Sequence, residues 1–162
     1  ILMKSKNRLL QKPKLIRSNV FHDNRGYLTE IISKKKYLNV KFSILTVSKK
    51  KVFRGLHFQK LYQQTKFIYL INGKIIDYCL DIRKNSRNYG KLYKFILNKN
   101  DSLFIPKGFA HGYKSLEQEN ILMYFMDNFR HKKYESGFLH KDISLTGFKI
   151  SNKDKILPIF KK

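Results

Sequence analysis

Short apolar and aromatic segments recur along most of this chain, broken every few residues by glycine, asparagine, aspartate or proline. β-Branched and aromatic residues dominate these segments, as they do in β-strands. No segment has the length and apolar period of a long helix. The pattern predicts strands over residues 27–32, 42–47, 66–71, 74–80, 93–97, 102–105 and 120–126. Many short strands at close spacing are typical of an antiparallel sandwich or barrel, so we expect an all-β fold.

The clearest turn lies between residues 66–71 and 74–80, where the sequence reads Asn72-Gly73. Both residues accept a positive φ, which the two central positions of a tight hairpin turn require. The sequence therefore predicts a β-hairpin in which these two strands pair with each other.

One domain is expected for the whole chain, because 162 residues with 42% hydrophobic residues fit a single core. Residues 1–12 and the lysine-rich tail 144–162, above all 155–162, are expected to attach loosely. No apolar run reaches the roughly 18 residues of a membrane span, and no secretory signal is visible. Cys79 is the single cysteine, so no internal disulfide can form and we expect a reducing, cytoplasmic location.

The charge balance is strongly positive, with 35 Lys and Arg residues against 11 Asp and Glu residues. A nucleic-acid binder has such a balance. Most of these cations, however, are lysines spread over the chain, whereas phosphate and base recognition favours arginine forks. We interpret the excess as a solvated lysine coat and expect no nucleic-acid partner, with polyanion binding as the alternative. Either surface would steer an anionic substrate toward the chain.

Three segments carry more polar chemistry than a β scaffold needs. They read FHDNRGYLTE at residues 21–30, RGLHFQ at 54–59 and IPKGFAHGY at 105–113. Strand alternation in the second segment predicts Arg54, Leu56 and Phe58 on one face, with His57 and Gln59 on the other.

A Pro-x-Gly turn precedes His111 and predicts that this residue begins the next strand. His57 and His111 on neighbouring strands would converge in the mouth of a barrel, a common place for ligands. A single histidine is more often a hydrogen-bonded core residue. Two histidines together with Arg54 and Lys66 in matching strand contexts favour a site.

Two convergent histidines also raise the question of a metal. His57 is followed by Phe58-Gln59, so a His-x-His ligand pair is missing, and the Lys66 ammonium would repel a divalent ion. Metal sites usually need three or four N, O or S ligands. We therefore expect neither a metal nor another cofactor.

These segments, together with GKIID at residues 73–77 and DIRKNS at 81–86, resemble the dTDP-4-dehydrorhamnose 3,5-epimerase family over residues 21–154. The resemblance implies an antiparallel cupin or jelly-roll barrel with little helix, and a homodimer formed by strand exchange at the N-terminal edge. It implies cofactor-independent epimerisation at C3 and C5 of a nucleotide-linked 4-keto-6-deoxy sugar. The expected conversion is dTDP-4-dehydro-6-deoxy-glucose to dTDP-4-dehydro-L-rhamnose, in deoxysugar and polysaccharide precursor synthesis.

The resemblance also implies a role for individual residues. His57 matches the catalytic base, Asp154 the carboxylate that pairs with it, Tyr124 the acid on the opposite face of the sugar, and Lys66 the cation that stabilises the enolate. The positions that match substrate contacts are Phe21, Arg25, Glu30, Arg54, Gln59, His111, Phe129, Glu135 and Lys153. These types suit the chemistry, since a 4-keto group acidifies the C3 and C5 protons, histidine takes protons near neutral pH, and inversion needs a second donor.

The chain departs from the family pattern on the strand before residues 54–59. The family usually carries Gln-x-Asn there, whereas this chain has Ile44-Leu45-Thr46, so we expect looser recognition of the nucleotide base. A mono-epimerase acting at C3 or C5, or on another nucleotide-sugar, is the nearest alternative. A non-catalytic basic cupin that only binds is another, although it would have no use for His57, Lys66, Tyr124 and Asp154 together.

Overall fold

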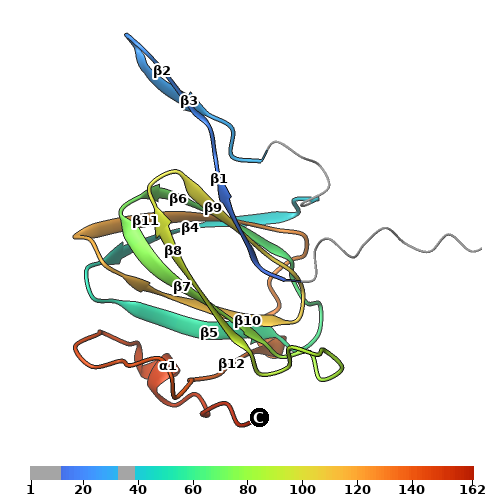
Figure 1. Ribbon diagram of the computed structural model, residues 1–162. Helices are drawn as coiled ribbons and strands as arrows, with labels where there is room; N and C mark the ends of the chain where they lie inside the picture. Colours follow the sequence, from blue (N-terminus) through green and yellow to red (C-terminus); the bar gives the residue numbers. More distant parts are fainter. Residues whose placement is uncertain (1–11, 33–38) are drawn as a thin grey trace, which may run out of the picture.

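The computed structural model describes residues 12–32 and 39–162, which form a two-sheet β-barrel (Figure 1). The strands are β1 (Lys14–Arg17), β2 (Val20–Asp23), β3 (Gly26–Thr29), β4 (Phe42–Lys49), β5 (Phe53–Gln59), β6 (Lys66–Asn72), β7 (Lys74–Asp81), β8 (Leu92–Asn98), β9 (Asp101–Ile105), β10 (Phe109–Ser115), β11 (Glu119–Met126) and β12 (Glu135–Gly137). A short 3-10 helix (Lys132–Tyr134) precedes β12, and one short helix, α1 (Asn152–Lys155), lies near the C-terminus.

Two five-stranded sheets face each other, with strand orders β1-β9-β6-β11-β4 and β12-β5-β10-β7-β8. All pairs between these named strands are antiparallel. The hairpin of β2 and β3 forms a separate two-stranded sheet that stands away from the barrel (Figure 1). The architecture confirms the expected all-β jelly-roll with little helix.

The barrel interior has an apolar part and a polar part, and both are lined by residues from the same faces of the same strands. On β6, Lys66, Ile68 and Leu70 are spaced two residues apart, and the last two are fully buried in the main core. On β11, Leu122 is likewise buried in that core, two residues before Tyr124. Each fully buried aliphatic side chain stabilises the fold by about 1.5–3 kcal/mol. The same strands therefore anchor the core and carry polar groups beside it.

The two strands expected to pair across Asn72-Gly73 form, and the chain turns there, but the predicted hairpin is wrong. β6 pairs with β9 and β11 in one sheet, while β7 pairs with β10 and β8 in the other. The turn thus carries the chain between the sheets. Gly73 has φ 93°, and a Cβ there would lie 2.6 Å from the backbone oxygen of Glu119. Glycine is required by this close approach as well as by the positive φ.

The remaining predicted strands appear with shifted ends. The segment predicted over residues 27–32 ends at Thr29, and β1, β2 and β12 were not predicted. β1 and β12 pair with the distant strands β9 and β5, which local sequence does not encode, whereas β2 pairs with the adjacent β3 across a short turn.

Individual apolar side chains of the C-terminal tail pack on the barrel, although most of residues 155–162 are exposed. Phe148, Ile150 and Phe160 pack against the second core cluster, on the outer face of the β5-β10-β7 sheet. Lys114 donates a hydrogen bond to the Ser144 carbonyl and lies 4.5 Å from the centre of the Phe148 ring. The sequence did not predict this packing, because the aromatic residues of the tail are surrounded by lysines. Across residues 12–32 and 39–162, no helix has the length and apolarity to cross a membrane.

Candidate active site

A cavity of about 370 Å³ opens between the two sheets beside the apolar core. His57, Lys66, His111, Tyr124 and Asp154 all line it. β5 and β10 supply the two histidines from one sheet, and β6 and β11 supply Lys66 and Tyr124 from the facing sheet. The structure therefore brings the four residues assigned to catalysis from sequence into one cavity.

A bulge in β5 changes which of its residues face this cavity. His57 pairs with His111, but Arg54 pairs with Tyr113, so β5 holds one more residue than β10 over this stretch. An added residue shifts the two-residue period, which puts Arg54 in the cavity with His57. The predicted grouping of Arg54 with Leu56 is therefore wrong, and Leu56 is buried in the outer core cluster.

Close packing of β5 against β10 depends on Gly55 beside that bulge. Its φ is 109°, and a Cβ there would lie 2.6 Å from the His111 carbonyl oxygen. A residue without a Cβ therefore allows the backbone of β10 to approach β5 closely here. This approach keeps His57 and His111 side by side.

His57 and Asp154 form a polar pair at the cavity wall. The Nε2 atom of His57 lies 3.1 Å from Oδ1 of Asp154, and the Gly55 backbone N–H donates to Oδ2 at 3.2 Å. Burial alone would raise the pKa of Asp154, but its hydrogen bond and charge interaction with His57, with help from Gly55 and Ser151, hold that pKa below its usual value. An ionised Asp154 fixes the Nε2–H tautomer and leaves Nδ1 of His57 free to accept a proton.

The sequence positions Asp154 through the N-terminus of α1. Ser151 caps this short helix, since its Oγ accepts the Asp154 backbone N–H at 3.1 Å. The cap holds a buried carboxylate against β5, far along the chain. Asp154 is 4% exposed, so it is no solvated tail residue.

Lys66 lies beside this pair, and its Nζ approaches the His57 carbonyl oxygen at 3.5 Å. Burial lowers the pKa of Lys66, while Cys79, Asp77 and Glu135 oppose that shift. A partly desolvated ammonium stabilises a nearby oxyanion more strongly than one in bulk water.

Tyr124 lies on the facing sheet and is 7% exposed. Burial raises the pKa of its phenol well above the ordinary value, with smaller contributions from Tyr113 and Asp77, whereas Arg54 and a hydrogen bond with Thr46 lower it. The phenol therefore keeps its proton at neutral pH, as a general acid must.

His111 packs edge-on against the Tyr124 ring, with ring centroids 5.9 Å apart. Its Nε2 atom lies 2.7 Å from Oδ2 of the fully buried Asp77. Burial lowers the pKa of His111, and the Asp77 carboxylate opposes this effect. His111 is thus held rigidly at the cavity wall.

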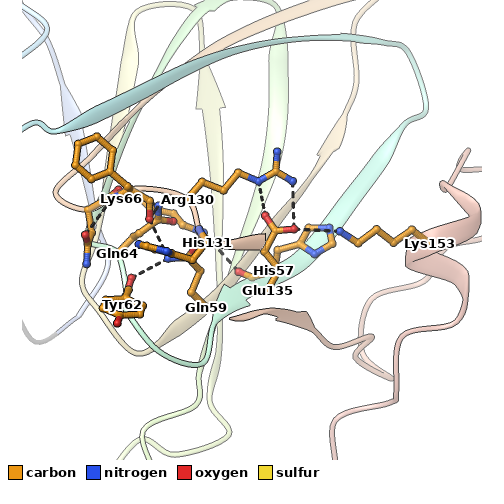
Figure 2. A network of polar contacts seen from close by, with 11 residues as sticks. His57, Gln59, Tyr62, Gln64, Lys66, Arg130, His131, Glu135 and Lys153 are labelled. Atoms are coloured by element: carbon orange, nitrogen blue, oxygen red, sulfur yellow. Dashed lines mark hydrogen bonds and ion pairs between the residues drawn. The ribbon is translucent and has the colours of Figure 1, made fainter. Parts of the chain in front are cut away.

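Arg130 and Lys153 converge on Glu135 at the rim of the cavity, next to His57 (Figure 2). The Arg130 guanidinium donates two hydrogen bonds to the carboxylate, and Lys153 Nζ donates to Oε2 at 3.3 Å. The Arg130 hydrogen bond is the largest cause that lowers the pKa of Glu135, to about 2. The rim therefore carries two cations oriented by one carboxylate.

Gln59 lines the cavity, but its amide is committed to backbone groups (Figure 2). Nε2 donates to the carbonyls of Tyr62 and Phe129, and Oε1 accepts the His131 N–H at 2.6 Å. Gln59 therefore organises the loop that carries Arg130. The Phe129 side chain is 55% exposed and does not line this cavity.

Phe21, Arg25 and Glu30 belong to the β2–β3 hairpin or the residue after it, and none of them lines the cavity of the same chain. Phe21 is 58% exposed, and Arg25 donates to its neighbour Asp23 at 2.6 Å. The hairpin points away from the barrel (Figure 1). The sequence-based grouping of these three residues with His57 is thus not met within one chain.

The sequence did not single out Arg130 or Tyr113, although both line the cavity. Arg130 follows the expected contact Phe129 and was counted only among the spread positive charges. Its pairing with Glu135 at i, i+5 across the 3-10 helix gave no recognisable motif. Tyr113 stood in a recognised segment, but its hydroxyl partners lie on β4, far along the chain.

A metal site is not apparent in the described part of the chain. Across residues 12–32 and 39–162, no three His, Cys, Asp or Glu side chains cluster closely enough to hold an ion.

The sequence matches the model of the dTDP-4-dehydrorhamnose 3,5-epimerase family over residues 8–162. The chain belongs to this family. The dTDP-4-dehydrorhamnose 3,5-epimerase of Methanothermobacter thermautotrophicus is 37% identical over 76% of this chain and 71% of that protein.

Solved structures of family members have the same fold. The dTDP-4-dehydrorhamnose 3,5-epimerase of Sulfolobus tokodaii has a TM-score of 0.83, with 34% identity over 93% of this chain and 92% of that one. The enzyme of the same name from Bacillus anthracis, solved with TDP and PPi bound, has a TM-score of 0.82 and 33% identity over 91% of this chain and 94% of that one.

Proposed function

We propose that the chain epimerises a dTDP-linked 4-keto-6-deoxy sugar at C3 and C5, with His57 as base and Tyr124 as acid. The observation that carries these roles is their position on opposite sheets across one cavity, with Asp154 behind His57. A sugar ring between the sheets would offer one face to each residue. Such a placement is what inversion at carbon requires.

Each inversion is a balanced proton exchange. Nδ1 of His57 removes the proton from C3 or C5, and the electron pair moves into an enolate whose charge rests on the 4-keto oxygen. The Lys66 ammonium stabilises that oxygen. Tyr124 then gives its hydroxyl proton to the same carbon from the other face, and both residues return to their starting states by exchange with solvent.

The diphosphate of the substrate would meet cations at the cavity rim. The cavity is lined by Arg54, Arg130 and Lys153. A guanidinium group can donate two parallel hydrogen bonds to the oxygens of one phosphate. Glu135 holds Arg130 and Lys153 in place. His111 supports the cavity wall and Gln59 supports the loop behind these contacts. The proposed function assigns neither residue to a metal or another cofactor.

The hairpin of β2 and β3 suggests how the remaining contacts are made. Phe21 and Leu28 are 58% and 63% exposed on it, and Arg25 and Glu30 do not line the cavity of their own chain. In a homodimer, the hairpin would bring Phe21, Arg25 and Glu30 to the cavity of a second copy, where Phe129 remains free to stack on the base. This exchange is part of the proposal.

Mixed dimers test that exchange. A His57→Asn chain, which is expected to be inactive alone, and an Arg25→Ala chain, which is expected to be weakly active alone, should regain activity when co-expressed if Arg25 acts in the other subunit. One of the two sites then contains both native residues. If the co-expressed pair shows no more activity than the two variants alone, the exchange is contradicted.

A reducing, cytoplasmic location also belongs to the proposal, since Cys79 is buried and unpaired. The positive surface is interpreted as a coat, so duplex DNA should bind with roughly micromolar or weaker affinity at physiological salt and without sequence preference. Tight, selective binding at that salt would contradict this reading.

The function is tested by NMR of the dTDP-linked keto sugar incubated with the protein in D₂O. Deuterium should enter at both C3 and C5, with the L-rhamno product accumulating. Incorporation and inversion at a single carbon would favour the mono-epimerase instead. Absence of both would reject the epimerase.

A further inference from the structure

A chain of hydroxyl groups runs along the cavity wall from Arg54 toward Tyr124. Arg54 Nε donates to Ser48 Oγ at 3.0 Å, and this oxygen lies 2.8 Å from the hydroxyl of Tyr113. The Tyr113 hydroxyl in turn lies 3.2 Å from Thr46 Oγ1. Three side-chain hydroxyls thus form a continuous path that starts at a permanently charged donor.

Thr46 places the end of this path beside Tyr124. On the antiparallel pair of β4 and β11, Thr46 is opposite Leu122, and Tyr124 is opposite Ile44. Thr46 and Tyr124 are therefore diagonal neighbours on one face, and both line the cavity. A tyrosine side chain spans the diagonal separation of such a pair. Burial raises the pKa of the Tyr124 phenol, and Thr46 opposes this by lowering it, as a hydroxyl that donates to the phenol oxygen does.

The first donor of the path favours one direction of donation. A guanidinium can only donate, so Ser48 accepts from Arg54 and its own proton is available for Tyr113. Either oxygen of each hydroxyl pair can be the donor, and in the order that starts from Arg54, Tyr113 donates to Thr46, which leaves the Thr46 proton for the Tyr124 oxygen. Ser48 and Tyr113 are 2% and 1% exposed, so little water competes for these groups.

We propose that Thr46 is a positioning residue for Tyr124: its hydroxyl, oriented by Tyr113, Ser48 and Arg54, donates to the phenol oxygen and stabilises it as its proton leaves. This role rests on the proposed function of Tyr124 as the acid. Once Tyr124 has protonated carbon, its oxygen carries negative charge in a buried place. A donor already aimed at that oxygen stabilises this state without rearrangement.

The sequence had suggested only a loss at this position, since Thr46 replaces an amide of the family pattern. In the structure, Thr46 instead has a hydroxyl that belongs to the path toward Tyr124. The hydroxyl of Thr46 serves the acid from the cavity wall, while Ile44, the other replacement, contributes an apolar surface.

Thr46→Val tests the proposal because it removes the hydroxyl and keeps the shape. Deuterium exchange at C3 reports proton removal by His57, and product formation reports delivery by Tyr124. We expect Thr46→Val to lower inversion about tenfold or more, the effect of one charge-assisted hydrogen bond, while exchange at C3 changes less than about threefold. Thr46→Ser, which restores the hydroxyl, should recover most of the inversion.

Tyr113→Phe tests the path behind Thr46. It should lower the ratio of inversion to exchange by less than Thr46→Val does. The double variant should be no worse than Thr46→Val alone, because both changes break the same path. Tyr69→Phe is the matched control: this buried tyrosine on β6 bonds Asn100 at 2.7 Å and does not line the cavity, so its ratio should stay native.

Two results separate failure of this inference from failure of the proposed function. If Thr46→Val lowers exchange and inversion equally, or only raises KM, Thr46 serves substrate binding and the inference is wrong. If the native protein neither exchanges nor inverts, the proposed function itself is wrong. A folded state is verified for every variant by its thermal unfolding.

Discussion

The imidazole of His57 and the carboxylate of Asp154 meet at 3.1 Å, although β5 and α1 lie far apart along the chain. The contact exists because the C-terminal tail packs on the outer sheet and a serine cap fixes the start of α1. The tail is therefore part of the site. Its removal would take away a catalytic partner as well as packing.

Asp154→Asn should reduce kcat by about 10²–10⁴ and change KM little. The amide can donate to Nε2 of His57 and so favour the wrong tautomer, as in other histidine–carboxylate pairs. Steady-state kinetics measure the effect. The control is Asp142→Asn, which removes an exposed carboxylate 3.8 Å from His140, outside the cavity, and should leave kcat unchanged. A loss confined to KM would argue against the orienting role.

Glu135→Gln should lower the melting temperature, and the difference from the native protein should shrink in acid. The pKa of Glu135 falls from 4.5 to about 2, mainly through its hydrogen bond with Arg130. Because the folded-state pKa is depressed, the ionised form stabilises the fold fully above pH 4.5, and this contribution is lost as the pH falls toward 2.

Melting temperatures at pH 7, 5 and 3 check this dependence, and exposed Glu117→Gln provides the comparison. A difference that stays constant between these pH values would contradict the ion-pair explanation.

Particular residues show where sequence reasoning succeeded. The apolar and aromatic residues of 120–126 predicted a strand, and the structure has β11 there. His57 and His111 converge as expected, because the turn before His111 leads directly into a strand beside β5. Local patterns were sufficient where a residue's neighbours follow from period and turn type.

Other features depended on distant partners and could not be predicted. Asn72-Gly73 has the composition of a hairpin turn, yet pairing of β6 and β7 with other strands decides its role. Arg54 changes face because of a bulge that only the β10 partner reveals. Arg130 contacts Glu135, and Tyr113 contacts Thr46 and Ser48, but no sequence motif predicts these contacts.

Dialysis against a strong chelator should leave turnover unchanged. Proton abstraction in the proposed mechanism relies on His57, and the enolate is stabilised by Lys66 rather than by a metal. Activity lost to the chelator and restored by a divalent ion would contradict this account.

Nucleotide recognition is expected to be loose, because Ile44 gives the cavity wall an apolar side chain that is 39% exposed. The preference for dTDP- over UDP-linked substrate in kcat/KM should stay below a thousandfold, or about 4 kcal/mol. Ile44→Gln, which restores an amide of the family pattern, should increase the preference. A native preference above that limit would show that other residues read the base.

The most direct test separates deuterium exchange from inversion in two variants. Tyr124→Phe removes one hydroxyl and keeps the ring, so C3 should still exchange through His57 and Lys66 while inverted product falls by about 10²–10⁴. His57→Asn should abolish both, since asparagine cannot take a proton at neutral pH. ¹H NMR of the keto sugar in D₂O follows both processes in one sample. Equal loss of exchange and inversion in Tyr124→Phe, or full activity in His57→Asn, would contradict the assignment of base and acid to opposite faces.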